Sequence, residues 1–247
     1  MSTPARPRLV SLVPSVTETL VAWGAPPVAC TRFCEQPGLP HVGGTKDPDV
    51  AAIAALDADL VVMCVEENRR EDADALAAAG VATASLSIDG VADVGPALSM
   101  LASLAGVAER AAADIDALDA VVDTDLAGDA SAATLRAFVP IWKRPWMSLA
   151  GETYGSSLLA AIGVANVFAD AGTRYPTVTL AEASERRPDV VLAPSEPYPF
   201  AERHVPLLAE VAPVVLVDGQ DLFWWGSRTP AALARLRDRL ADISPSS

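Results

Sequence analysis

The sequence predicts an α/β protein made of two lobes, each with a parallel sheet, joined by a single long backbone helix. Apolar, β-rich segments alternate with helical segments along residues 8–90 and again along 134–247, which is the pattern of a parallel sheet covered by helices. Residues 91–125 hold no strand candidate. The order of residue types in "LDADLVVMCVEE" (56–67) also returns in "RRPDVVLAPSEP" (186–197). Each lobe is therefore predicted to be Rossmann-like.

The N-terminal lobe, residues 8–90, opens with a strand and a helix. The segment 8–14 is rich in β-formers and ends at Pro14. A helix is predicted over 15–24, because Ser15 and Glu18 have the spacing of a capping box and Gly24 can end the last turn. The other elements predicted in this lobe are strands at 27–33, 59–65 and 81–87 and helices at 47–58 and 70–80.

The connecting segment, residues 91–125, is predicted to be one helix. Its apolar residues follow an approximate helical stripe. About 30 helical residues would extend roughly 45 Å at 1.5 Å per residue, which is long enough to span two lobes. The C-terminal lobe, residues 134–247, then repeats the alternation, with strands at 135–142, 189–195 and 214–218 and helices at 154–163, 179–188, near 200–210 and at 229–243.

The N-terminal residues bear on the cellular compartment in which the protein works. Residues 1–7 are interpreted as a short disordered leader, and Pro14 and Glu18 interrupt the apolar stretch that follows it. A secretory signal needs about 7–15 uninterrupted apolar residues. The sequence alone therefore predicts a cytoplasmic protein.

Charge and cysteine content exclude several classes of protein. The net charge is −14 and no Lys/Arg cluster exceeds two residues, so nucleic acid is a poor partner. The apolar runs are far shorter than the ~20 residues of a membrane-spanning helix. An odd number of cysteines, three, argues against a secreted disulfide framework.

Three longer motifs carry a resemblance to a known family. They are "RLVSLVPSVTETLVAWG" (8–24), "LPHVGGTKDPDVAAIAALDADLVV" (39–62) and "YPTVTLAEASERRPDVVLAPSE" (175–196). In this order and spacing, the sequence resembles the class III, helical-backbone substrate-binding proteins that serve cobalamin, haem and iron-siderophore ABC importers. It looks most like the vitamin B12-binding branch, in a short signal-less form known as a helical backbone metal receptor.

The resemblance implies a non-catalytic binding protein that captures a corrinoid or related metal chelate between its two lobes and has no cofactor of its own. It also implies a possible ABC permease as partner, docked through one exposed glutamate on each lobe. Those two positions align with Arg70 and Ala181, and Glu71 and Glu182 stand beside them, so the docking residues stay open. By family analogy, the alternative location is periplasmic or extracellular.

The candidate ligand-binding residues follow strands or lie in loops. Four of the five tryptophans fall in "IWKRPWM" (141–147) and "DLFWWGS" (221–227); aromatic residues gathered on loops are typical of a surface for a bulky, flat ligand, although the rings could instead be core. The resemblance further implies that the turn at residues 14–17 presents backbone N–H groups to the ligand. The full predicted set is Pro14, Ser15, Thr17, Phe33, Glu67, Asn68, Trp142, Trp146, Tyr154, Glu196, Tyr198, Trp224, Trp225 and Arg228.

Other functions are considered and ranked lower. A bare metal receptor of this architecture would need several histidines with carboxylates, and the chain has only His41 and His204. The spacing of Cys30 and Cys34, with Cys64, is a weak signal for a thiolate site, and no metal site is predicted. No catalytic or phosphate-binding motif occurs, so no enzyme activity is predicted. A cytoplasmic sensor or enzyme that reuses the fold is the alternative.

Overall fold

The computed structural model describes residues 6–125 and 135–245. Within them the chain forms two compact units: unit 1 runs to Ile88 and resumes over Ala92–Asp119, and unit 2 comprises Asp89–Val91 and the chain from Ala120 onward. Each unit holds a four-stranded parallel sheet with helices, so the predicted fold class is confirmed. In the described part of the chain, no helix is long and apolar enough to cross a membrane.

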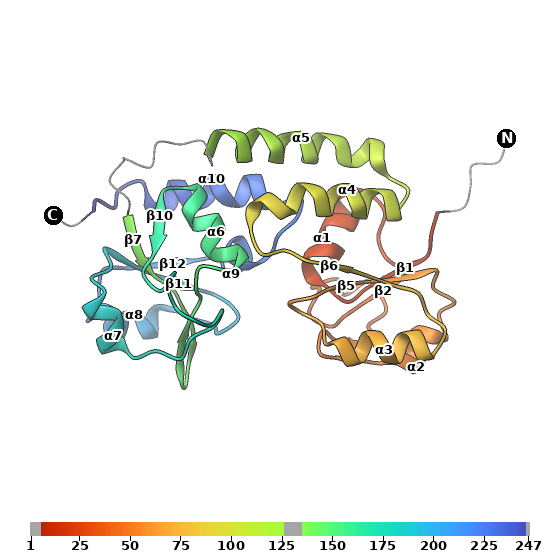
Figure 1. The fold of residues 1–247 in the computed structure, drawn as a ribbon, viewed down its shortest axis with the longest axis horizontal. Coiled ribbons are helices and arrows are strands. Elements are labelled where there is room, and N and C mark those ends of the chain that lie inside the picture. The colour runs from red at the N-terminus through yellow and green to blue at the C-terminus, as the bar shows by residue number, and fades with distance from the viewer. Residues whose placement is uncertain (1–5, 126–134, 246–247) are drawn as a thin grey trace. The chain divides into compact units, whose positions relative to one another are not determined.

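Unit 1 is built on a sheet with the strand order β2-β1-β5-β6. Figure 1 shows α1 and α4 (Val94–Leu104) on one face of this sheet and α2 and α3 on the other. The core between the sheet and α2 and α3 is aliphatic and includes Val10, Ile53, Val61 and Leu76. The elements are β1 (Leu9–Ser11), α1 (Pro14–Ala22), β2 (Ala29–Cys30), the antiparallel pair β3 (Gly43–Gly44) and β4 (Asp47–Pro48), α2 (Val50–Ala54), β5 (Leu60–Cys64), α3 (Arg70–Ala78) and β6 (Thr83–Leu86).

The start of α1 differs from the prediction. The helix begins at Pro14 rather than Ser15, its N-cap is Val13, and no side chain caps it. Proline suits the first helical position because its φ is already helical and it has no N–H to satisfy. The predicted capping box with Glu18 is therefore wrong, whereas Gly24, at φ +65°, ends the helix as predicted.

The segment predicted to be one helix is broken. A 3₁₀ turn η1 (Val91–Asp93) leads into α4 (Val94–Leu104), and α5 (Ala108–Asp125) follows after a turn. Gly106 adopts φ +65° there, a conformation that glycine reaches without strain, and the N–H of Val107 donates back to the carbonyl of Ala102 at 2.9 Å. These are the features of a glycine-terminated helix.

Unit 2 repeats the plan of unit 1 with the strand order β10-β7-β11-β12. The start predicted for this lobe, residue 134, lies outside the described residues, as do residues 1–5 of the predicted leader. The elements are β7 (Leu135–Phe138), β8 (Pro140–Lys143), β9 (Trp146–Ser148), α6 (Tyr154–Ala161), β10 (Val164–Asn166), α7 (Leu180–Glu185), β11 (Val190–Pro194), η2 (Glu202–His204), α8 (Val205–Leu208), β12 (Val214–Val217), α9 (Gly219–Phe223) and α10 (Thr229–Leu240).

The hairpin β8–β9 was not expected from the sequence, which predicts a single strand over 135–142. β7 pairs with β10 and β11 in the parallel sheet, and β8 leaves it to pair antiparallel with β9. At the base of the hairpin, the buried hydroxyl of Ser148 donates to the carbonyl of Val139, the residue between β7 and β8, at 2.9 Å. It therefore projects from the carboxyl end of β7.

Candidate functional site

Three connections leave the carboxyl ends of the unit 2 strands: the β8–β9 hairpin after β7, the loop 195–204 after β11, and α9 after β12. Ligands of open parallel sheets bind at these ends. Trp142, Trp146, Glu196, Tyr198 and Arg228, all predicted ligand residues, lie on or close to these connections. The structure thus gathers five of the eight candidates of the C-terminal lobe at one edge of its sheet.

The hairpin and the loop together form a group of five rings, which we call the aromatic cluster: Trp142, Trp146, Tyr198, Phe200 and His204. Trp142 meets Tyr198 edge-on with ring centroids 5.6 Å apart. Tyr198 contacts Phe200 at 4.8 Å, and Phe200 lies parallel to Trp146 at 6.1 Å. Trp142 is 43% exposed. One large ring is therefore held at the surface by a continuous group of rings behind it.

His204, which no sequence pattern singled out for this role, completes the cluster. Its ring contacts both Tyr198 and Phe200 with centroids 5.5 Å away. The main-chain N–H of Ala201 donates to Nδ1 of His204 at 3.1 Å, so the ring proton belongs on Nε2, which faces the Tyr198 hydroxyl at 3.5 Å. Burial lowers the pKa of His204, with smaller contributions from Arg203 and Lys143. The imidazole is therefore held neutral.

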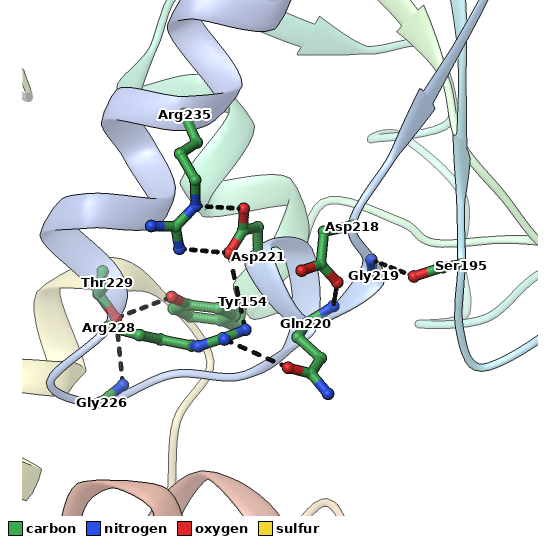
Figure 2. A network of polar contacts seen from close by, with 10 residues as sticks. All are labelled: Tyr154, Ser195, Asp218, Gly219, Gln220, Asp221, Gly226, Arg228, Thr229 and Arg235. Carbon is green, nitrogen blue, oxygen red and sulfur yellow. Dashed lines mark hydrogen bonds and ion pairs between the residues drawn. The ribbon is translucent and has the colours of Figure 1, made fainter. Parts of the chain in front are cut away.

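Arg228, the N-cap of α10, lies beside α9 in a second group of polar contacts, shown in Figure 2. Its Nη2 donates to the side-chain oxygen of Gln220 at 3.2 Å, and its Nη1 lies 3.6 Å from the carboxylate of Asp221. Arg235 binds the same buried carboxylate through two hydrogen bonds of 2.6 and 2.7 Å. The Arg228 guanidinium also lies 5.5 Å from the ring of Trp224. Its side chain, 15% exposed, is thus fixed in position.

Three aromatic residues predicted to face the ligand are buried instead. Trp224 and Trp225 are 9% and 3% exposed, and Tyr154 is 6% exposed. The Tyr154 hydroxyl pairs with that of Thr229 at 3.0 Å (Figure 2), and burial raises the pKa of Tyr154. Tyr154 starts α6, just as it starts the helix predicted over 154–163, whereas Trp224 and Trp225 directly follow α9, where the sequence predicts a loop.

Glu196 is positioned by a close approach between two connections. The N–H of Gly219 donates to Oγ of Ser195 at 2.9 Å (Figure 2). A Cβ atom at Gly219 would lie 2.6 Å from the main-chain nitrogen and 2.8 Å from the main-chain oxygen of Glu196. Glycine is therefore required here, and the loop after β11 is set directly against the start of α9.

Unit 1 also exposes apolar side chains at the carboxyl ends of its strands. Phe33, which follows β2, is 51% exposed, and its ring lies 4.7 Å from the guanidinium of Arg32. Val65, directly after β5, is 64% exposed, and the half-buried Glu66 and Glu67 come next. The sequence does not single out Val65 as a candidate, because a valine at the end of an apolar segment cannot be told apart from the buried residues of the strand before it.

The other unit 1 candidates have internal roles. The Asn68 side chain donates to the carbonyls of Leu12 and Thr45 at 3.2 and 2.8 Å and accepts from the N–H of Cys64 at 2.8 Å. It joins three segments rather than presenting its amide to a ligand.

The turn at residues 14–17 was expected to present backbone N–H groups to a ligand, but Pro14 and Thr17 cannot do so. Pro14 has no N–H, and the N–H of Thr17 donates to the carbonyl of Val13 at 3.0 Å. Pro14, Ser15 and Thr17 are all buried in the first turn of α1. The prediction that Pro14 and Thr17 supply N–H groups to a ligand is therefore wrong.

Among the residues the structure describes, no three or more His, Cys, Asp or Glu side chains are grouped so that they could hold a metal ion. His41 contacts the carbonyl of Gln36 at 3.2 Å in unit 1, and His204 lies in the aromatic cluster.

Comparisons with known proteins agree on one family. Residues 9–202 match the model of a family described as periplasmic binding protein. The vitamin B12-binding protein of Pectobacterium carotovorum subsp. carotovorum (strain PC1) is 25% identical over 250 residues, which cover 97% of this chain and 90% of that protein.

Two solved structures share the fold. The periplasmic vitamin B12 binding protein BtuF of Vibrio cholerae superposes with a TM-score of 0.79 at 20% identity, over 96% of this chain and 97% of that one. The periplasmic heme-binding protein RhuT from Roseiflexus sp. RS-1, in its apo form, gives a TM-score of 0.78 at 21% identity, over 96% and 99%. At these identities the likeness establishes the fold.

These findings correct the predicted location. The relatives are periplasmic binding proteins, which points to the periplasm rather than the cytoplasm. The cytoplasmic prediction relied on the interpretation of residues 1–7 as a leader and on Pro14 and Glu18 as interruptions of the apolar stretch. Pro14 and Glu18 belong to α1, so they do not bear on export.

Proposed function

Because this chain belongs to the periplasmic binding protein family, we propose that it captures a corrinoid or a related metal chelate, such as haem, and performs no chemistry on it. The relatives named above bind vitamin B12 or heme. Both ligands are large, flat and partly apolar, and the proposal carries this ligand class over to the present chain.

The observation that carries the proposal is the aromatic cluster. A flat macrocycle gains most from a ring that is exposed yet held in one orientation, because the ring loses little freedom on binding. Trp142 meets both conditions, since it is 43% exposed and Tyr198 supports it from behind. Unit 1 separately exposes two apolar side chains, Phe33 and Val65, at the carboxyl ends of its own strands.

Arg228 and Glu196 are proposed as the polar contacts. The planar guanidinium of Arg228 suits carboxylates, phosphates and amides, which decorate natural corrinoids and haems. Asp221 and Gln220 hold this guanidinium in one plane. Glu196, set against Gly219, can accept hydrogen bonds from amides.

A titration of the purified full chain tests the proposal. Cyanocobalamin, hemin and ferrichrome are added separately, and tryptophan fluorescence and the visible spectrum of each ligand are followed. We expect saturable one-to-one binding of at least one of them at micromolar concentration, with a spectral change that free cobalt or iron salts do not reproduce. No response to any of the three chelates would overturn the proposal.

We further propose that the loaded protein docks on an ABC permease. Glu71 lies in the first turn of α3 and Glu182 in the first turn of α7, and both are exposed. Glu182 also closes a capping box with Thr179, whose main-chain N–H donates to its carboxylate at 2.6 Å. Charge reversal at both glutamates should abolish retention on membranes that contain the permease, whereas reversal of the exposed Glu210 should not. Equal retention of both variants would contradict the docking assignment.

A further inference from the structure

Arg32, just after β2 in unit 1, is held in place through both its main chain and its side chain. Its main-chain N–H donates to the carbonyl of Gly43 at 2.9 Å. Its Nη2 donates to the two carboxylate oxygens of Asp47 at 3.1 and 3.0 Å. Gly43 starts β3 and Asp47 starts β4, and these two strands pair with each other. The arginine is therefore attached at two points to the β3–β4 pair.

The β3–β4 pair is itself anchored to the sheet of unit 1. The carbonyl of Thr45, in the turn between the two strands, accepts a hydrogen bond from the side chain of Asn68 at 2.8 Å. That side chain also accepts from the N–H of Cys64, the last residue of β5, at 2.8 Å. Next to β3, the N–H of Val42 donates to the carbonyl of Cys30, the last residue of β2, at 2.9 Å. The pair is therefore tied to two strands of the sheet.

The two glycines of the segment "HVGGTKD" (41–47) have different roles. Gly43 adopts φ +90°, a conformation that glycine reaches without strain. Gly44 instead leaves room for two side chains: a Cβ atom there would collide with Oδ1 of Asp47 and would lie 2.8 Å from Nη2 of Arg32. Both atoms are at the ends of side chains, so an added methyl group would displace the ion pair and not the backbone.

The guanidinium of Arg32 lies over the ring of the next residue, Phe33, with Cζ 4.7 Å from the ring centroid. This is within the about 6 Å at which a cation is attracted to the face of an aromatic ring. Phe33 is 51% exposed, and the guanidinium covers one face of it, which leaves the opposite face and the edge for a ligand. A ring that is already held loses less freedom when a ligand packs against it.

We propose that Arg32 is a positioning residue for ligand binding: fixed by Asp47 in the space beside Gly44, it holds the Phe33 ring in the orientation that packs against a flat chelate. This inference rests on the proposed function, because Phe33 is one of the residues expected to bind the ligand. It gives a role to an arginine and a glycine that are outside the predicted set of ligand residues.

The two units hold their exposed rings by different means. Trp142 in unit 2 is supported by the ring of Tyr198, whereas Phe33 in unit 1 is held by the charge of Arg32. The side chains of Arg32 and Phe33 are both about half exposed, so removing that charge leaves no internal cavity. Substitutions that release the ring should therefore change ligand affinity and leave the stability of the fold nearly unchanged.

Fluorine NMR tests the contact without any ligand. The chain has five phenylalanines, and protein that contains 4-fluorophenylalanine should give one resonance for each, of which Phe33→Leu identifies that of residue 33. We expect this resonance to move more than the other four in Arg32→Gln, which removes the charge, and in Gly44→Ala, which displaces the ion pair. Arg70→Gln is the matched control at an exposed arginine that starts α3, and it should leave the resonance in place. An unmoved Phe33 resonance in Arg32→Gln would overturn the proposal.

Titration with cyanocobalamin, hemin and ferrichrome separates positioning from a purely structural role. For the chelate that the wild-type protein binds, Arg32→Gln and Gly44→Ala should each weaken the affinity about two- to fivefold, the size expected for a cation–ring contact at an exposed site. Arg70→Gln should bind as the wild type does. In the Phe33→Leu background, Arg32→Gln should have no further effect, because the ring that it positions is absent.

The outcomes that contradict this inference differ from those that contradict the proposed function. Wild-type affinity in Arg32→Gln, or the same loss of affinity with and without the Phe33 ring, would overturn the positioning role while the wild-type protein still binds its chelate. If the wild-type protein bound none of the three chelates, the proposed function and the positioning role would both be overturned.

Discussion

The main-chain N–H of Arg136 donates a hydrogen bond to Oδ2 of Asp189 at 2.8 Å, and so ties the start of β7 to the start of β11. The N–H of Arg8 makes the same bond to Oδ2 of Asp59 at 2.7 Å between β1 and β5. In both pairs the aspartate N–H returns a bond to the arginine carbonyl, at 2.8 and 2.9 Å. The two sheets therefore share one construction at their amino ends.

The aspartates should differ in their importance to stability. Asp189 is 6% exposed, whereas Asp59 is exposed. We expect Asp189→Ala to lower the free energy of unfolding by about 1.5–3 kcal/mol, because a part-buried hydrogen bond loses its charged acceptor, and Asp59→Ala by about 0.5–1.5 kcal/mol, because the bond there is exposed and water replaces the carboxylate. Urea unfolding followed by circular dichroism measures both. Equal losses of unfolding free energy in the two variants would show that burial of the aspartate does not determine the size of the effect.

The repeated fold could be predicted because its signals are local. An aspartate before a continuous apolar strand occurs at Asp59 and at Asp189, and the structure uses both in the same way. The hairpin could not be predicted, because the apolar run "LRAFVPIW" continues across the point between Phe138 and Pro140 where the chain leaves the sheet. The break between α4 and α5 at Gly106 could not be predicted for a similar reason, because apolar residues continue at helical spacing on both sides of it.

The candidate site was predicted only in part, because sequence shows that aromatic residues share a loop but not which way each ring points. Trp142, Trp146 and Tyr198 come together in the aromatic cluster. Trp224 and Trp225, equally loop-like in sequence, pack inside unit 2. Whether a ring points inward depends on contacts between residues far apart in the chain.

Substitution of Trp225 should therefore affect the stability of the fold rather than ligand binding directly. It is 3% exposed, and truncating a buried tryptophan leaves a cavity as well as losing its transfer energy. We expect Trp225→Ala to lower the free energy of unfolding by about 3–5 kcal/mol, whereas Trp142→Ala should change it by less than about 1 kcal/mol. Thermal and urea unfolding compare the two variants. A nearly unchanged Trp225→Ala protein would place that ring at the surface.

Trp142 should act through ligand affinity. If the proposed macrocycle lies against this ring, Trp142→Ala should weaken binding of the chelate found by titration about tenfold, since a ring contact contributes about 0.5–1.5 kcal/mol beyond its buried area. Met100→Ala is the matched control, because Met100 is also exposed, at 45%, but lies on α4. Unchanged affinity in Trp142→Ala, or an equal loss in Met100→Ala, would remove Trp142 from the site.

His204 should make stability depend on pH. Its pKa in the folded protein is lowered, mainly by burial and also by Arg203 and Lys143, while the unfolded chain titrates near pH 6.5. Below that pH the unfolded state binds a proton that the folded state resists, so this contribution to stability is complete above about pH 6.5 and is lost as the pH falls through the folded-state pKa. Protonation would also put a hydrogen on Nδ1, where the Ala201 N–H now donates.

The matched variant is His204→Asn, because its side-chain oxygen can replace Nδ1 as the acceptor for Ala201 but cannot take up a proton in this range. We expect wild-type protein to lose more stability than His204→Asn when urea unfolding at pH 7.5 is compared with that at pH 5. His41→Asn, which alters the exposed histidine of unit 1, should keep the wild-type slope. The slope difference isolates His204 because the carboxylates that also titrate at low pH are common to all three proteins. If His204→Asn and wild type lost the same stability, the neutral imidazole would have no part in holding the aromatic cluster together.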